Sequence, residues 1–313
     1  MSSRHALDND LSATEQASQQ ASLDLLYEEA LGQETEEARA AGAVGYMAQT
    51  LARATLPHAR TRAYSHERAN GHLRVVVSSD PRYGLPYGPK PRLILAWLTT
   101  RAVETKERWI GLGATFGDYL ANIGIDHMTG GQRGTIRVVR DQSIKLFTAS
   151  IRIIYDDGKA FSQRKCDITD DVSLWWDPDN PNQLGLGQSS VKLSENFFEE
   201  VTAAPIPISL QAMHALRGSS MAMDIYCWLT HRFSYLRRPT PIPWIYLQKQ
   251  FGAGYPDTTQ GLRDFRNKGF IPNLKHVLQV FPQARVDHDA EYLRLYPSRT
   301  HVRPVNVKNK TKK

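Results

Sequence analysis

The order of helical and strand-like patterns in the middle of the chain restricts its fold more than any other feature. The patterns up to residue 167 are a helix at 90–107, a strand at 109–112, helices at 115–124 and 130–147, and a hairpin at 149–167. Thr115, with Asp118 three positions later, predicts a helix N-cap, and the pair Asp157 and Gly158 predicts the tight turn of the hairpin. Helix, strand, helix, helix, hairpin is the order of a winged-helix module.

The second half of the chain repeats this order without obvious sequence identity. Its patterns are a strand at 191–193, helices at 221–233, 242–251 and 259–280, and a hairpin at 284–296. Ser194 predicts the N-cap of a helix that follows the strand, and Pro272 should kink or divide the helix at 259–280. We therefore predict an α+β fold with two tandem winged-helix domains.

The two ends of the chain differ in composition from its middle. The first residues are rich in Ser, Gln, Ala and Glu and hold too few apolar side chains to fold alone, and the last residues are basic. We predict a disordered acidic arm and a disordered basic tail around the folded part. The predicted boundaries are the arm at 1–60, the first domain at 61–176, a linker rich in Pro and Asn at 177–188, the second domain at 189–303, and the tail at 304–313.

The net charge of +7 is distributed unevenly along the chain. Residues 1–40 hold nine acidic and two basic side chains, a net charge of −7, so the remaining residues have a net charge of +14. Such an excess of positive charge suits a polyanionic partner, which indicates nucleic acid. The alternative is that these charges only keep the protein soluble, and composition alone does not separate the two interpretations.

The sequence also indicates where the protein acts and which groups it lacks. The longest apolar runs, 93–98 and 222–229, are far shorter than the ~20 residues that a membrane-spanning helix needs, and no export signal is found at the N-terminus. We expect a cytoplasmic protein without a membrane partner. Cys166 and Cys227 are far apart and have no Cys or His neighbours at metal-binding spacing, so we expect no disulfide, no zinc site and no cofactor.

The helix at 130–147 has the pattern of a recognition helix that enters the major groove of DNA. Arg133, Arg137 and Arg140 recur at positions i, i+4 and i+7, beside a stripe of apolar residues that can face the core. A guanidinium offers a planar fork of donors to guanine edges and phosphates. The alternative is an ordinary solvated helix face.

Further candidate DNA-binding residues lie in the predicted hairpin and in the second domain. In the hairpin they are Lys159, Arg164 and Lys165, which would lie along the DNA backbone. In the helix at 259–280 they are Arg263, Arg266, Asn267, Lys268 and Lys275. We predict that Arg266 recognises a base and that Lys159 contacts phosphate.

Several short motifs, in this order, resemble the plasmid-encoded RepA-type replication initiators over residues 83–303. The motifs lie at 87–92, 97–99, 110–113, 116–120, 250–252, 265–274, 281–286 and 295–298. The resemblance implies that the protein binds directly repeated double-stranded sites (iterons) at a plasmid origin and helps to open the duplex. It also implies a homodimer in equilibrium with a monomer, recruitment of the host initiator and the replicative helicase, and repression of its own promoter. Gly269 and Pro272, within an expected helix, depart from a regular recognition helix.

Two other functions share some of these features. A transcriptional repressor without an initiation role would need the same DNA-binding residues. A tyrosine recombinase is suggested by the spacing of His214 and Arg217, followed by Tyr226, Tyr235 and Tyr246, but the residues around Tyr226 are apolar. The sequence has no His-x-His motif of a nicking enzyme and no Walker-type phosphate loop, so we expect no catalytic site.

Overall fold

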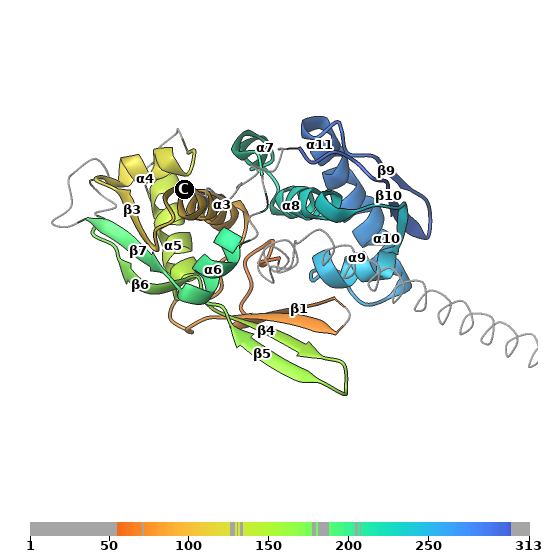
Figure 1. The fold of residues 1–313 in the computed structure, drawn as a ribbon, viewed down its shortest axis with the longest axis horizontal. Helices are drawn as coiled ribbons and strands as arrows, with labels where there is room; N and C mark the ends of the chain where they lie inside the picture. The colour runs from red at the N-terminus through yellow and green to blue at the C-terminus, as the bar shows by residue number, and fades with distance from the viewer. Residues whose placement is uncertain are drawn as a thin grey trace, which may run out of the picture.

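The computed structural model describes residues 55–70, 72–125, 129, 131, 134–176, 180, 188–203, 206 and 208–301. Most of the predicted acidic arm and all of the predicted basic tail lie outside these residues. The elements up to residue 203 are β1 (Ser65–Asn70), β2 (Leu73–Ser78), α3 (Pro89–Thr105), β3 (Trp109–Gly113), α4 (Phe116–Asn122), α5 (Thr135–Thr148), β4 (Ser150–Asp156), β5 (Phe161–Lys165), β6 (Thr169–Ser173), β7 (Ser189–Leu193) and α6 (Glu195–Ala203) (Figure 1).

The remaining elements form the right-hand half of Figure 1. They are α7 (Leu210–Ala215), α8 (Ser220–Tyr235), β8 (Thr240–Pro243), α9 (Trp244–Phe251), α10 (Thr259–Asp264), the π-helical segment η1 (Phe265–Phe270), α11 (Ile271–Val280), β9 (Val286–His288) and β10 (Tyr292–Leu295). The mixture of helices and strands confirms the predicted mixed class. Among the described helices, none is both long and apolar enough to cross a membrane.

The local signals placed several elements correctly. Thr115 Oγ1 accepts a hydrogen bond from Asp118 N (3.1 Å), and the Asp118 carboxylate accepts one from Thr115 N (2.8 Å), which is the capping box at the start of α4. Ser194 Oγ accepts from Phe197 N (3.1 Å) at the start of α6. The helix expected from residue 130 begins only at Thr135, because the N-cap residue Gly134 is extended (φ −67°, ψ 155°) and Gly131 has a positive φ of 83°.

Two of the three sheets have the same strand order. In the sheet β3-β7-β6, β3 lies at one edge and precedes the helices α4 and α5, and β7, the last of the three in the sequence, lies in the middle. In the sheet β8-β10-β9, β8 likewise lies at one edge and precedes α9 and the path from α10 to α11, and β10, again the last, lies in the middle. The strand β7, expected to open the second domain, is therefore hydrogen-bonded between β3 and β6, and the segment 177–188 connects two neighbouring strands of one sheet. The domain boundaries given above stay a prediction.

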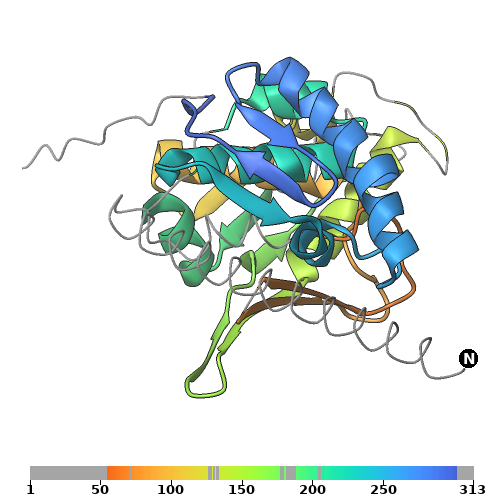
Figure 2. The same ribbon diagram turned by 90° about the vertical axis from the view of Figure 1, so that its right-hand side faces the viewer.

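The hairpin β4–β5 lies in a third sheet, of order β1-β2-β4-β5. The strands β1 and β2 were not predicted from the sequence, and β2 pairs with β4 along its whole length. The hairpin predicted as the wing of the first module therefore lies in another sheet than β3. In Figure 2 this hairpin projects from the body of the molecule as a yellow-green two-stranded ribbon.

The helix expected at 259–280 follows a single helical path, in which η1 replaces one stretch of α-helix. The backbone of Asp264 and of Ile271, on either side of η1, is right-handed helical, so Pro272 does not break the path. Proline has no N–H and its ring crowds the carbonyl four residues earlier, and a wider π-turn before it relieves both problems. A Cβ at Gly269 would lie 2.5 Å from the hydroxyl of Tyr255, so a larger residue there would have to displace that side chain.

Candidate nucleic-acid interface

The helix α5 has the two faces expected of it. Ile136, Val139 and Leu146 are buried against the core, whereas Arg137 is exposed and Arg140 is half-buried. Arg133 lies outside the described residues. Arg140 Nε is buried and finds no hydrogen-bond partner among the described residues.

Two aspartates hold the tip of the β4–β5 hairpin, and the first, Asp156, accepts a hydrogen bond from Gly158 N at Oδ1 (3.0 Å). Asp157 Oδ1 accepts hydrogen bonds from Lys159 N (2.8 Å) and Ala160 N (2.7 Å), and Gly158 supplies the positive φ of 79°. These hydrogen bonds lower the pKa of Asp157. Lys159 is exposed at this ordered tip, and the neighbouring Phe161 side chain is 67% exposed. The tip therefore presents a cation and an aromatic ring to solvent.

Arg164 and Lys165 point to opposite faces of their strand. Arg164 Nη2 donates to Asn196 Oδ1 (3.1 Å) and lies 3.9 Å from the carboxylate of Glu199, so Arg164 packs against α6. Lys165 is exposed and lies 2.8 Å from Asp167. Both residues were predicted to face DNA from one strand. The sequence around Arg164 gave no sign of α6, because the helix that covers this side chain comes about thirty residues later in the chain.

A buried carboxyl group lies beside Arg164. Burial raises the pKa of Glu200 to about 7, and the guanidinium of Arg164 opposes this rise. The thiol of Cys166 lies 3.6 Å from the same carboxyl group. Arg164 thus acts electrostatically on α6 within the protein.

Two cations of this sheet were missed by the sequence analysis. Arg152 is exposed and lies directly opposite Lys165 in the β4–β5 ladder. Arg74, on β2, lies 3.8 Å from Glu67 and 4.0 Å from Asp156. The alternation of polar and apolar residues in 150–156 could have indicated that Arg152 faces solvent.

In the second half, the candidate residues lie along α10, η1 and the start of α11. Arg263, Asn267, Lys268 and Lys275 are exposed, and Arg266 is half-buried. Lys268 Nζ lies 2.8 Å from Asp264, and its hydrogen bond lowers the pKa of that carboxyl group.

Arg266 connects this helical segment to the β9–β10 turn. Its guanidinium donates to Asn267 Oδ1 (3.0 Å) and to the carbonyl oxygen of Ala290. The turn itself is ordered by Asp289, whose carboxylate accepts from Glu291 N and Tyr292 N, both at 2.8 Å. These backbone hydrogen bonds lower the pKa of Asp289 to about 2. The segment η1 and the β9–β10 hairpin are thus joined side by side through Arg266.

Two of the residues that suggested a tyrosine recombinase, Tyr226 and His214, pack against other parts of the protein. Tyr226 is fully buried, and its hydroxyl accepts from Ser209 N (2.9 Å) and lies 2.9 Å from His301 Nδ1. The His214 ring packs against Gly124, where a Cβ would lie 1.5 Å from the imidazole. Within the described part of the chain, no group of three or more His, Cys, Asp or Glu side chains is placed to hold a metal ion.

The match to a protein family agrees with the resemblance in the sequence. Residues 85–241 match the family described as plasmid-encoded RepA protein, and no curated protein matches the chain. A crystal structure of domain 2 and domain 3 of RctB superposes with a TM-score of 0.51 and 12% identity, covering 80% of this chain and 98% of that one. A second structure, of RctB domains 2-3, gives a TM-score of 0.48 and 11% identity, covering 78% of this chain and 95% of that one. At 12% identity, the superposition with a TM-score of 0.51 shows a similarity of fold alone. Because the family match spans half of the sequence, this protein belongs to the family of plasmid-encoded RepA proteins.

Proposed function

We propose that this protein initiates plasmid replication by binding repeated double-stranded sites at its origin. The observation that carries the proposal is the strand order shared by β3-β7-β6 and β8-β10-β9, each joined to a pair of helices. That arrangement suits two tandem winged helices, with β6–β7 and β9–β10 as the wings. A recognition helix in each, α5 and α10–η1–α11, would enter the major groove with its exposed arginines.

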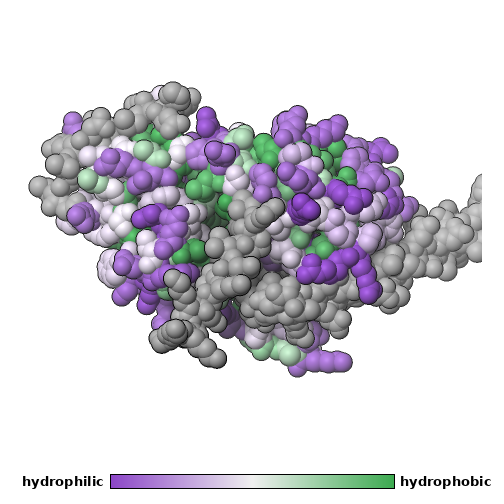
Figure 3. Space-filling view, turned by 45° about the horizontal axis from the view of Figure 1, so that its top comes forward, coloured by the Kyte–Doolittle hydropathy of each residue, from purple (hydrophilic) through white to green (hydrophobic). Residues whose placement is uncertain are grey.

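The remaining parts of the proposal follow from family membership and from the surface. We propose that the protein acts in the cytoplasm and without enzymatic activity of its own. It would help to open the duplex, recruit the host initiator and the replicative helicase, and repress its own promoter. Polar side chains cover much of the face shown in Figure 3, with apolar side chains in small patches between them.

Footprinting of the full-length protein on its parent plasmid tests this function. We expect protection of several short repeats beside the origin, and loss of plasmid replication when these repeats are deleted. Protection of one promoter site, with replication unaffected by its deletion, would instead favour the repressor.

The outer face of the β3-β7-β6 sheet is the best candidate for the homodimer contact. Trp109 and Trp175 are each 52% exposed. Lys192 on β7 lies opposite Trp109 on one side and opposite Asp171 on the other. Its Nζ lies 5.6 Å from the centroid of the Trp109 ring. A two-fold contact pairs a surface with itself, so one copy's lysine would meet its partner's aspartate while the tryptophans are covered.

We expect Trp109→Ser to shift the protein from dimer to monomer in sedimentation experiments at micromolar concentration, because the substitution removes the largest apolar contact of this face. Tyr64→Ser, which removes a ring that is 54% exposed elsewhere, is the matched control and should stay dimeric. A wild-type protein that sediments as a monomer at every concentration would contradict this assignment.

A further inference from the structure

The segment 55–58 contacts both halves of the protein, the elements from β1 to α6 and those from α7 to β10, and we call it the strap. Its first residue, Thr55, is only 2% exposed. Thr55 Oγ1 donates to the carbonyl oxygen of Gln250 on α9 (3.1 Å) and accepts from Arg68 Nε on β1 (3.0 Å). His66 Nε2 on β1 lies 2.9 Å from Thr55 O. One threonine is thus bonded to both halves at once.

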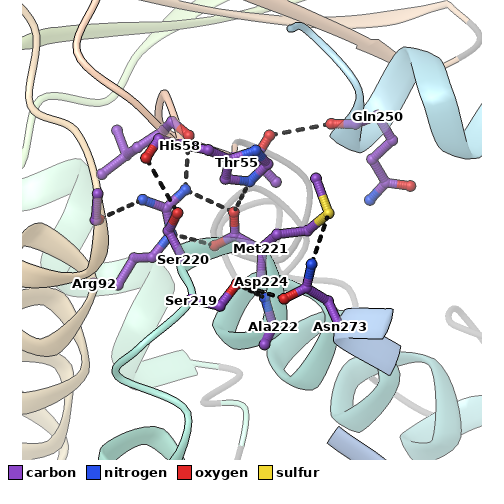
Figure 4. Close-up of polar contacts among 12 residues, drawn as sticks. Thr55, His58, Arg92, Ser219, Ser220, Met221, Ala222, Asp224, Gln250 and Asn273 are labelled. Atoms are coloured by element: carbon purple, nitrogen blue, oxygen red, sulfur yellow. Dashed lines mark hydrogen bonds and ion pairs between the residues drawn. The ribbon is translucent and has the colours of Figure 1, made fainter. Parts of the chain in front are cut away.

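The rest of the strap is also bonded on both sides. On the side of α3, Arg92 Nη2 donates to the carbonyl oxygen of Leu56 (2.7 Å), and Gly88 N donates to that of Pro57 (3.0 Å). On the side of α8, Ser220 Oγ donates to His58 O (3.3 Å). Figure 4 shows the labelled side chains of this cluster converging from both halves.

A buried ion pair closes the joint beneath the strap. Arg92 on α3 donates from Nε to Asp224 Oδ1 and from Nη2 to Asp224 Oδ2 on α8, both at 2.6 Å, and His58 Nε2 lies 2.9 Å from Oδ2 (Figure 4). Burial alone would raise the pKa of Asp224, but Arg92 and His58 outweigh it and lower that pKa. Burial also lowers the pKa of His58, although the carboxylate of Asp224 opposes this shift.

We propose that the strap fixes the relative orientation of the two halves, and thereby the spacing along DNA of the two segments that the protein recognises. Buried polar groups that lose their partners are costly, so one arrangement of the halves satisfies this network and others leave donors and acceptors unpaired. With a fixed joint, the two recognition helices accept one spacing, whereas halves held by a flexible linker would accept several. Thr55 and His58 are therefore positioning residues that touch no DNA. This inference rests on the proposed function.

The test compares binding of the full-length protein to its own repeat, mapped by footprinting, and to repeats with one to five base pairs inserted between the two protected segments. We expect the wild-type protein to bind the inserted repeats about 10- to 100-fold more weakly, because one half loses its base contacts. Thr55→Val keeps the shape of the side chain but removes both hydroxyl bonds, and His58→Ala removes the contact with Asp224. Both variants should bind the original repeat with an affinity within about threefold of that of the wild type. Inserting base pairs into the repeat should lower their affinity by less than about threefold.

Two further variants separate positioning from general weakening. Thr55→Ser retains the hydroxyl and should restore the wild-type dependence on spacing. Tyr119→Phe removes a buried hydrogen bond to Ser143 (3.1 Å) within the first half, and it should leave that dependence unchanged. Equal spacing dependence in wild type, Thr55→Val and His58→Ala would overturn this inference and leave the proposed function intact. A wild-type protein that protects no repeat would overturn the proposed function itself.

Discussion

Replacing Arg92 with methionine should lower the free energy of unfolding by about 3–5 kcal/mol, because it leaves the charge of Asp224 buried without the guanidinium that pairs with it. Arg92 is 5% exposed and makes both short hydrogen bonds to that carboxylate. Urea denaturation followed by tryptophan fluorescence measures the change. The double substitution Arg92→Met with Asp224→Leu removes both charges and should recover most of the loss.

The control for this prediction is an exposed ion pair of similar chemistry. Arg101 lies 3.1 Å from Glu104 on the same helix, with the two side chains 46% and 56% exposed, so Arg101→Met should change stability little. The Arg92 effect should also depend on pH. Since the pKa of Asp224 is lowered on folding, its contribution is present above the unfolded pKa and is lost as the pH falls through the folded value. Equal losses from Arg92→Met and Arg101→Met would contradict a special role for the buried pair.

Arg266→Ala should weaken binding to the plasmid's own repeat by about 1–3 kcal/mol and leave binding to unrelated duplex nearly unchanged. In the function proposed above, the half-buried guanidinium of Arg266 would donate to a base edge next to the exposed Asn267, and the substitution would remove that contact. Fluorescence anisotropy with repeat and scrambled duplexes measures both affinities. Because Arg266 also holds the β9–β10 turn through Ala290, Arg263→Ala on the preceding turn is a second test without that contact.

Lys159→Ala is the matched comparison, since this residue is exposed at the tip of a hairpin. It should weaken binding to both duplexes equally and reduce the slope of log affinity against log salt by about 0.9, as expected for one lost phosphate contact. If Arg266→Ala and Arg263→Ala also weaken both duplexes equally, this helical segment contacts only the DNA backbone.

The sequence predicts those parts of the fold that depend on neighbouring residues. The capping box at Thr115, the N-cap at Ser194 and the hairpin turn at Gly158 are local signals, and each appears where expected. The sheet partners of the hairpin are not local, because β2 pairs with β4 across more than seventy residues. For this reason the sequence predicted the hairpin β4–β5 but not the sheet to which it belongs.

The candidate site shows the same division between local and distant information. Periodicity correctly predicted the buried face of α5 and the exposure of Arg137. It could not show that Arg164 meets Asn196, or that Arg266 reaches Ala290, because both partners lie more than twenty residues away. The joint around Asp224 was missed altogether, since no short motif connects Thr55, Arg92 and Asp224.

The π-helical segment η1 has a consequence for length variation among related chains. A π-turn holds one residue more than an α-turn, and the wider turn accommodates that extra residue. Removing one residue from Phe265–Phe270 would therefore restore a regular α-helix and leave Lys275 and the apolar side chains of α11 facing about as they do now. Removing one residue from α11 itself would instead rotate the side chains that follow by about 100° around the helix axis and turn part of its apolar face away from the core.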